Sequence, residues 1–470
     1  MPDHRSPLVV LVLAAGQGKR LRSKTNKLLH RVAGRPMVAL VLDAASALGP
    51  DRLVTVVGHQ ADQLREALDG QPTRFVLQRE QRGTGHAVLA ASRAIGQNDG
   101  ATLLVLDGDL PAVKPATLRR FIARHRRGGA VFSMLTAEPV SPDGRARVVR
   151  DERGRVLKVV QHRDATPAEK TITEVDCGIY CAAPGALIGS LKRLARKSPR
   201  SEHHVADAVR DLVERGEKTV AVTHHDAEEI IGVDTRQDLS RATRALYARK
   251  ADDLQSAGVT VLDADSTWID PRARIGRDTV IYPGVLIEGA CTVGEDCLIG
   301  PGCHLTNMTV GRGAQIFDHC VMIDSSIGDG ALVGPFARLR PGSVLEEGSR
   351  VGNFVELKKT RLGPGSKANH LAYLGDSTIG PSCNIGAGTI TCNYDGAHKY
   401  PTVMGRGVFI GSDTQLIAPV TLGDGAYVGA GATITNDVPA GALALSRQPQ
   451  KNIEGWVERR AKKSKKSKKK

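Results

Sequence analysis

The chain has 470 residues, several times the ~150 of an average domain, so we expect more than one domain. Hydrophobic residues make up 41% and charged residues 24%, which excludes a disordered protein, and no apolar run reaches the ~18 residues of a transmembrane helix. The net charge is +15, but residues 459–470 contain nine basic residues and no acidic one. We therefore expect a disordered tail at 457–470 that binds polyanions weakly.

The N-terminus and the cysteines bear on where the protein resides. The apolar stretch at 8–13 runs directly into a glycine loop, unlike a signal peptide, and the eight cysteines form no CxxC pair. We expect a cytoplasmic protein without a disulfide framework or a zinc ribbon.

Continuous apolar runs, typical of buried strands, alternate with helix-like patterns in the first half of the chain. The predicted strands are 8–13, 53–57 and 103–106, and the predicted helices are 36–48, 85–95 and 115–127. This alternation predicts an α/β domain over 1–236, with a Rossmann-like, mostly parallel sheet covered on both faces. A helical linker at 237–257 follows, because apolar residues recur there at near-helical spacing.

A glycine-rich loop, LAAGQGKR at 13–20, follows the first predicted strand. Backbone amides at such a position can bind phosphate, although an ordinary strand-to-helix turn also uses glycine. The loop lacks the GxxxxGK[ST] sequence of a Walker A motif, and Leu21 stands where a dinucleotide fingerprint needs its third glycine. A nucleotide site here would be of neither type.

Three further features support a phosphate site. Lys27 lies a few residues after the loop, where a cation can neutralise a polyphosphate. Gly83–His86 opens a predicted helix and offers a second set of amides. Asp107 and Asp109 follow a strand, at the usual ligand edge of an open α/β sheet, and such carboxylates suit Mg²⁺.

From Ile275 onward the sequence has a six-residue repeat, as in IGRDTV, VGEDCL and IGDGAL. An aliphatic residue opens nearly every unit, glycine often follows it, and a small residue takes the fifth place. This period predicts a left-handed parallel β-helix of hexapeptide repeats over 258–456, with the aliphatic side chains pointing inward. Cys291, Cys297 and Cys303 fall at the small position, where we expect core filling rather than a metal site.

Two insertions interrupt the repeat, at 367–373 and 391–404, and such loops commonly carry function. His370 lies in the first insertion, close to Tyr373. A lone histidine is often structural, but a neutral imidazole is also suited to take a proton from an amine. His370 is therefore a candidate general base.

The glycine loop, Lys27, Gly83–His86 and Asp107–Asp109 resemble the nucleoside-diphosphate-sugar pyrophosphorylase family. With the hexapeptide half, residues 7–456 resemble the bifunctional enzymes of that family, which make UDP-N-acetylglucosamine for the cell wall. The resemblance implies Mg²⁺ as cofactor, bound by Asp109 and Asp234, with the catalytic residues Arg20 and Lys27 facing the phosphates. The nucleotide- and sugar-binding positions that it implies are Leu13, Ala14, Ala15, Gly16, Lys27, Gln78, Gly83, Thr84, Gln161 and Asp176.

Residues 368–375, ANHLAYLG, and 384–395, NIGAGTITCNYD, resemble the acetyltransferase half of the same enzymes. The resemblance implies that His370 deprotonates the amine of glucosamine 1-phosphate, that Glu356 orients His370, and that acetyl-CoA is the co-substrate. The implied glucosamine-phosphate contacts are Arg340, Lys358, Tyr373 and Asn384. The implied acetyl-CoA contacts are Ala387, Asn393, Tyr394, Ser412, Ala430 and Arg447. The resemblance further implies a homotrimer with sites between neighbouring β-helices.

The first half departs from the family pattern at several positions. The family usually has Thr at Lys19, Pro at Asn26, Tyr at Asp107, Gly at Ala146, Glu at Gln161, and Asn at Asp176 and Asp234. Ala146, Gln161 and Asp176 correspond to sugar contacts. Gln161 and Asp176 still supply one amide and one carboxylate with the roles exchanged, which fits either the same sugar in a shifted geometry or a different sugar.

Three functional hypotheses follow. The first is a bifunctional enzyme that acetylates glucosamine 1-phosphate and then transfers uridylyl from UTP to the product, releasing pyrophosphate. The second keeps the acetyltransferase and gives the first domain another sugar or nucleotide. The third is a non-catalytic scaffold with the same domain pair, against which the presence of Arg20, Lys27, Asp109 and His370 argues.

Overall fold

The computed structural model describes residues 6–198, 202–230, 232–446 and 449–467, with side chains up to Ala461. The chain divides into two compact units, Met1–Lys250 and Ala251–Lys470. Among the described residues, no helix combines the length and the apolarity needed to cross a membrane.

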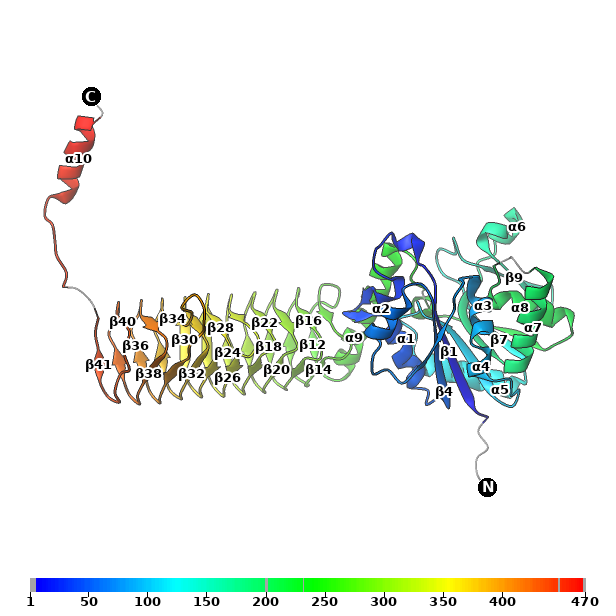
Figure 1. Cartoon of the computed structure of the whole chain (residues 1–470), viewed down its shortest axis with the longest axis horizontal. Helices are drawn as coiled ribbons and strands as arrows, with labels where there is room; N and C mark the ends of the chain where they lie inside the picture. Colours follow the sequence, from blue (N-terminus) through cyan, green and yellow to red (C-terminus); the bar gives the residue numbers. More distant parts are fainter. Residues whose placement is uncertain (1–5, 199–201, 231, 447–448, 468–470) are drawn as a thin grey trace, which may run out of the picture. The chain divides into compact units, whose positions relative to one another are not determined.

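A mixed sheet forms the centre of the first unit, with strand order β11-β7-β10-β6-β1-β4-β5 (Figure 1). These strands are β1 Leu8–Ala14, β4 Arg52–Val57, β5 Arg74–Leu77, β6 Thr102–Asp107, β7 Phe132–Ala137, β10 Val175–Ala182 and β11 Thr219–His224. β10 is antiparallel to both β6 and β7, whereas the other pairs along this path are parallel. The first residues of β10 therefore lie at the edge where the parallel strands end.

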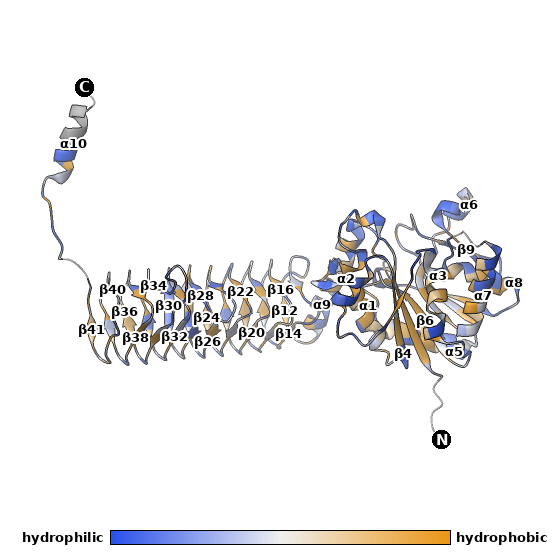
Figure 2. Cartoon of the chain, in the orientation of Figure 1, coloured by the Kyte–Doolittle hydropathy of each residue, from blue (hydrophilic) through white to orange (hydrophobic). Residues whose placement is uncertain are grey.

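Helices cover both faces of this sheet, which confirms the predicted α/β fold. The helices are α1 Met37–Ser46, α2 Ala61–Ala67, α3 Gly83–Ala90, α4 Ser92–Ile95, α5 Pro115–Gly128, α6 Pro167–Lys170, α7 Pro184–Lys197 and α8 Ala208–Glu214. Alternate residues of β1 enter two cores: Val10 and Val12 pack with α1 and α5, and Val9 and Leu11 pack with α3 and α7. Figure 2 shows the central strands as markedly hydrophobic.

Helix α9, Arg236–Ser256, is followed by a left-handed parallel β-helix that runs from β12 (Thr260–Val261) to β41 (Leu443–Ala444). Successive strands enter three parallel sheets of 11, 10 and 9 strands, so each third strand is a neighbour in space. Cys291, Cys297 and Cys303 are buried in its core, which confirms that they fill space.

The structure differs from the sequence prediction at the C-terminus. Residues Trp456–Ser467 form helix α10, where the charge run predicts a disordered tail. The segment after Gly455 is rich in Lys and Arg and contains one Glu and one Ala, all of which favour helix, and it has neither glycine nor proline. The Arg460 guanidinium also lies 5.0 Å from the ring centroid of Trp456, one turn earlier. Residues 468–470 of the predicted tail lie outside the described residues.

Candidate functional sites

A cleft of about 700 Å³ opens at the carboxyl edge of the first sheet. It is lined by the loop after β1, by the start of α3 and by the residues that end and follow β6, because parallel strands end together at one edge. The predicted site residues that line it are Leu13, Ala15, Gly16, Arg20, Lys27, Gln78, Gly83, Thr84, Asp109 and Asp234. Ala14 instead faces the core on the α1 side of the sheet.

Lys27 lies at the centre of an ionic cluster in this cleft. Its Nζ donates to Asp109 Oδ2 and to Asp234 Oδ1, each at 2.6 Å, and the Arg20 guanidinium lies 2.8 Å from Asp234 Oδ1. Burial by itself lowers the pKa of Lys27, but the two carboxylates outweigh it and hold that pKa above its usual value. Gly18, at φ +61°, packs on the lysine stem: a Cβ there would come 2.3 Å from Lys27 Cβ.

Backbone contacts hold the two carboxylates together. The Val233 N–H donates to the Asp109 carbonyl at 3.0 Å, which ties the segment before α9 to the end of β6. Asp238 Oδ2 accepts the N–H groups of Thr235 at 2.9 Å and Asp234 at 3.2 Å. Because both carboxylates reach one ammonium nitrogen, they are also close enough to reach one Mg²⁺, for which oxygen donors are suited. The residues present therefore fit the implied metal.

Gln78 and Thr84 are fixed at the other side of the cleft. Gln78 is buried, and its Nε2 donates to the Gly83 carbonyl at 3.1 Å and lies 3.0 Å from His86 Nδ1. Thr84 Oγ1 accepts the N–H of Val205 at 3.0 Å. These bonds hold the start of α3 against the cleft.

Asp107 and Asp176 add two more carboxyl groups beside the cluster. The Tyr180 hydroxyl donates to Asp176 Oδ2 at 2.5 Å, and burial nevertheless raises the pKa of Asp176. Burial, followed by the charges of Asp109 and Asp176, raises the pKa of Asp107 well above its usual range. Asp107 Oδ1 is buried and has no hydrogen-bond partner among the described residues. Gly178, at φ +70°, permits this packing, since a Cβ there would lie 2.2 Å from Asp107 Oδ2.

Gln161 does not line the first cleft. It lines a second cleft of about 730 Å³, together with residues of α7 and α8, and is absent from the lining of the first. The lining of the first cleft instead includes Glu202 and His204, which no sequence motif indicated. Only the fold of the segment before α8 brings these two residues to the cleft.

The second site lies on the β-helix. His370 ends β30 (Lys367–His370) and pairs in register with Asn353 of β27 (Arg350–Asn353), one coil earlier. His370 Nδ1 and Asn353 Oδ1 are 3.1 Å apart. An amide oxygen only accepts, so this bond places the hydrogen on Nδ1 and leaves Nε2 free to act as a base.

The position of Glu356 differs from the implied one beside His370. It begins β28 (Glu356–Lys358), which belongs to another sheet of the β-helix than β27 and β30. Its Oε1 accepts from Arg340 Nη1 at 2.9 Å. Among the described residues, the side-chain hydrogen bond of His370 is therefore with Asn353, and Glu356 orients the Arg340 guanidinium instead.

Arg340, which contacts Glu356, also belongs to a group of three cations. A contact with the ammonium of Lys399 lowers the pKa of Lys358, and the charge of Arg340 adds to this effect. Mutually repelling cations form a site that an anion such as a phosphate stabilises. No sequence motif indicates Lys399, which lies in the insertion at 391–404.

Tyr373, Asn384 and Asn393 lie on neighbouring coils. Tyr373 begins β31 (Tyr373–Gly375), and Asn384 begins β33 (Asn384–Ile385). A Cβ on Gly375 would lie 2.6 Å from the Tyr373 hydroxyl and 2.7 Å from Asn393 Nδ2, so glycine lets both side chains lie over this strand. Asn393 Nδ2 also donates to Asp376, and the exposed Tyr394 donates to the Gly396 carbonyl.

Small residues form a column that leads to His370. The Asp413 N–H donates to the Ala387 carbonyl at 2.7 Å, and the Gly431 N–H donates to the Ser412 carbonyl at 2.8 Å, which places Ala387, Ser412 and Ala430 on successive coils. One coil earlier, the Gly388 N–H donates to the carbonyl of Leu371, the residue after His370, at 2.8 Å. Three predicted acetyl-CoA contacts thus follow one edge of the β-helix. Arg447 lies outside the described residues.

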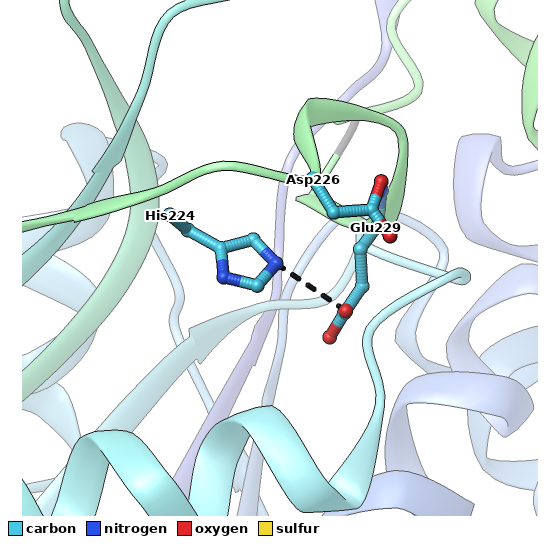
Figure 3. A group of neighbouring side chains, drawn as sticks. All are labelled: His224, Asp226 and Glu229. Carbon is cyan, nitrogen blue, oxygen red and sulfur yellow. Dashed lines mark hydrogen bonds and ion pairs between the residues drawn. The ribbon is translucent and has the colours of Figure 1, made fainter.

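A third polar group, His224, Asp226 and Glu229, has a structural explanation (Figure 3). His224 Nε2 lies 3.3 Å from Glu229 Oε2. The Lys114 ammonium lies 3.4 Å from Asp226 Oδ2 and 3.6 Å from Glu229 Oε2, and the Lys114 N–H donates to Glu229 Oε1 at 2.9 Å. These carboxylates therefore already have a cation and fix the start of α5.

Known families and proteins resemble both units. Residues 10–253 match the MobA-like NTP transferase domain, residues 264–364 the GMPPB C-terminal domain and residues 401–436 six repeats of the bacterial transferase hexapeptide. A protein of Pelobacter propionicus named bifunctional protein GlmU is 44% identical over 458 residues, covering 97% of this chain and 99% of its own. Proteins of the same name from Trichlorobacter lovleyi and Koribacter versatilis are 44% and 42% identical, covering 95% and 98% of this chain and 97% and 98% of their own.

Proposed function

Because the chain belongs to the family of bifunctional GlmU proteins, we propose that it makes UDP-N-acetylglucosamine by two transfers, one in each unit. The chain is an enzyme with acetyltransferase and uridylyltransferase activities. The observation that carries the proposal is that one chain contains both the Lys27–Asp109–Asp234 cluster and the His370–Asn353 pair. The nucleotide and acetyl-CoA are intracellular metabolites, so we propose a cytoplasmic reaction.

His370 is the proposed base of the acetyl transfer. The amine nitrogen of glucosamine 1-phosphate attacks the thioester carbonyl of acetyl-CoA, and the carbon–sulfur bond breaks. His370 Nε2 takes the proton from the amine and returns it to the leaving sulfur, so that coenzyme A leaves as the thiol. Asn353 is a positioning residue, because its bond to Nδ1 holds the tautomer that this step needs.

The substrates of this transfer have separate places along the β-helix. Arg340, Lys358 and Lys399 bind the sugar phosphate, and Glu356 fixes the guanidinium of Arg340. Tyr373 and Asn384 are proposed contacts of the sugar phosphate, and Asn393 is a proposed contact of acetyl-CoA. Acetyl-CoA lies along the column Ala387–Ser412–Ala430, which leads its thioester toward His370.

The uridylyl transfer uses the cluster of the first unit. The phosphate of N-acetylglucosamine 1-phosphate attacks the α-phosphorus of UTP in line, and pyrophosphate leaves. Lys27 and Arg20 stabilise the negative charge that develops on the phosphoryl oxygens, and Gln78, Gly83 and Thr84 bind the nucleotide. Mg²⁺, held by Asp109 and Asp234, would neutralise the phosphates when bound.

A different sugar at this first site is the second candidate, and one observation favours it. Asp107 stands where the family usually has tyrosine, and its buried Oδ1 lacks a partner among the described residues. A buried polar oxygen without a hydrogen-bond partner is costly, so a substrate that supplies a partner there is preferred. Asp176 also differs from the asparagine that the family usually has at this position, and Gln161 lines the second cleft.

A homotrimer is the proposed assembly, supported by an apolar ridge on one corner of the β-helix. Phe336, Phe354 and Leu371 occupy this corner on successive coils and are 49%, 56% and 61% exposed. The two phenylalanine rings stack at 5.5 Å. All three residues have φ between +39° and +57°, which is unfavourable for bulky side chains, so a partner surface would explain bulky apolar residues at these positions.

The proposal is tested with the purified full chain. Acetyl transfer is followed as free thiol released from acetyl-CoA with glucosamine 1-phosphate, and uridylyl transfer as pyrophosphate released from UTP and Mg²⁺. A parallel set of sugar 1-phosphates and nucleoside triphosphates supports the first candidate if N-acetylglucosamine 1-phosphate and UTP give the highest kcat/KM. A higher value for another sugar supports the second.

A further inference from the structure

The loop that leads into β8 (Arg147–Arg150) contains an arginine that neither transfer has used so far. Arg145 is partly buried, and its guanidinium forms neither an ion pair nor a hydrogen bond with the residues that the structure describes. A partly buried cation without an acidic partner loses hydration and gains no ion pair in return. Such a group is a candidate binding site for an anion.

Gly232 brings this guanidinium beside the ionic cluster of the first cleft. A Cβ on Gly232 would lie 3.8 Å from Arg145 Nη1 and 3.8 Å from Asp109 Oδ1. Lys27 binds the other oxygen of this carboxylate, Oδ2. The charge of Arg145 also reaches α9: burial raises the pKa of Asp238, but its hydrogen bonds and the charge of Arg145 lower that pKa below its usual value. Arg145 is not among the residues that line the cleft, so it lies at the rim, beside Asp109.

Buried contacts fix the backbone of Arg145. The Arg147 side chain has no exposed surface, and its Nη1 donates to the carbonyls of Arg145 at 2.7 Å and Pro142 at 2.6 Å. The Arg145 N–H donates to the same Pro142 carbonyl at 3.2 Å, which closes a turn. The Asp176 N–H donates to the Ala146 carbonyl at 3.0 Å and ties the loop to the start of β10. The loop is therefore held in place, while the Arg145 guanidinium has no partner in the described part of the chain.

The acceptor phosphate is the anion that fits this position. Lys27 and Arg20 supply positive charge from the segment after β1. In-line transfer needs the attacking phosphate and the leaving pyrophosphate on opposite sides of the α-phosphorus, so a cation from a different loop is suited to the attacking phosphate. The Arg145 loop is bonded to Asp176, where the proposed function has the sugar bind. The phosphate of the same molecule then lies near Arg145.

We propose that Arg145 binds the phosphate of the sugar 1-phosphate that enters the uridylyl transfer, an inference that rests on the proposed function of the first unit. One oxygen of this phosphate forms the new bond to the α-phosphorus and the bond to pyrophosphate breaks, while Arg145 neither gives nor takes a proton. The planar guanidinium donates to the phosphate oxygens that do not react. Because these bonds exist before and during the transfer, they act on KM of the acceptor rather than on kcat.

Kinetic constants of the full chain with Arg145→Gln test the proposal. The acceptor is the sugar 1-phosphate with the highest kcat/KM, since all of them carry the phosphate. We expect KM of the acceptor to rise about 10- to 100-fold, the effect of lost charge-assisted hydrogen bonds, while kcat and KM of UTP change less than about threefold. Arg145→Lys should recover part of the loss, because an ammonium keeps the charge but not the planar fork.

Arg153→Gln is the matched control. Arg153 is exposed in the turn between β8 and β9 (Val156–Val160), so this variant loses the same charge from the same hairpin. We expect its kinetic constants to equal those of the parent chain. Equal constants for Arg145→Gln and Arg153→Gln would overturn the proposal. A higher KM of UTP or a higher Mg²⁺ requirement, with KM of the acceptor unchanged, would also overturn it, because Arg145 would then act on the nucleotide or the metal.

The parent chain separates this proposal from the proposed function. A parent that releases no pyrophosphate with any sugar 1-phosphate and nucleoside triphosphate would overturn both. An active parent whose KM of the acceptor does not depend on Arg145 would overturn the present proposal alone. Melting temperatures are compared as well: the Arg145 guanidinium has no partner among the described residues, so Arg145→Gln should melt at the temperature of the parent.

Discussion

The acetyl transfer depends on one imidazole whose tautomer is set by a neighbour on the preceding coil. Replacing His370 by Ala should lower kcat of acetyl transfer by ~10²–10⁴, the usual contribution of a general base, because the amine then keeps its proton. Uridylyl transfer should be unchanged, since its residues lie in the other unit. Both rates are measured on the same preparation. An equal loss of both would indicate misfolding and contradict the assignment.

Two further variants separate the roles of Asn353 and Glu356. Asn353→Ala should lower kcat less than His370→Ala and change the pH profile of acetyl transfer, because the Nδ1 hydrogen loses its acceptor. Glu356→Gln should mainly raise KM for glucosamine 1-phosphate, because Glu356 contacts Arg340. A large loss of kcat in Glu356→Gln, with KM unchanged, would instead favour the original expectation that Glu356 acts on His370.

The metal site gives a second prediction about single side chains. The family usually has Asn at Asp234, so Asp234→Asn should keep uridylyl transfer but require more Mg²⁺ for half-maximal rate, since one negative charge is lost. Asp109→Asn should abolish most of the activity. A Mg²⁺ titration of pyrophosphate release measures both. An unchanged Mg²⁺ requirement in Asp234→Asn would show that Asp234 is not a ligand, although it contacts Lys27.

The repeat predicts which side chains enter the β-helix, but not which of them meet across coils. The inward positions follow from the six-residue period, and Cys291, Cys297 and Cys303 are buried as expected. Contacts between coils also depend on coil length, which insertions change. Asn353 and His370 are one coil apart, 17 residues, and could have been paired by counting back one coil. Lys399 lies in an insertion without a period, so only the fold reveals it.

The sequence predicts two other features incorrectly: the conformation of the C-terminus and the cleft that Gln161 lines. A basic run predicts a solvated tail, but the same residue types also favour helix, and the structure forms α10. Gln161 is assigned to the sugar site by resemblance, whereas the packing of β9 (Val156–Val160) places it in the second cleft. The sequence alone cannot show which of two neighbouring clefts a loop residue enters.

The apolar ridge of the β-helix supports a prediction about assembly. The same corner carries Gly302 and Gly388 on other coils, at φ +66° and +76°. Replacing Phe336 and Phe354 by Gly should therefore relieve backbone strain while removing the apolar surface. We expect the trimer to dissociate in sedimentation experiments and acetyl transfer to fall, while uridylyl transfer stays. A variant that remains a trimer would exclude this ridge from the interface.

The two units have separate cores, and helix α9 contributes to both. Ala242, Leu246 and Tyr247 pack in the core of the first unit, and Leu254 packs in the core of the β-helix. The sequence pattern predicts a first domain that ends at 236 and a linker at 237–257. The burial of these side chains leads us to propose instead that the first domain needs α9 as far as Lys250.

Two fragments test where the first domain ends. A fragment of residues 1–250 should fold and release pyrophosphate, because it keeps Leu246 and Tyr247 in its core. A fragment ending at Arg236 loses both, at about 2–5 kcal/mol for a buried side chain of this size, against a total stability of about 5–15 kcal/mol. It also loses Asp238, whose carboxylate holds the Asp234 backbone. We expect it to melt at least ~10 °C lower and to lose Mg²⁺-dependent activity. Equal melting temperatures and rates would show that α9 is only a linker.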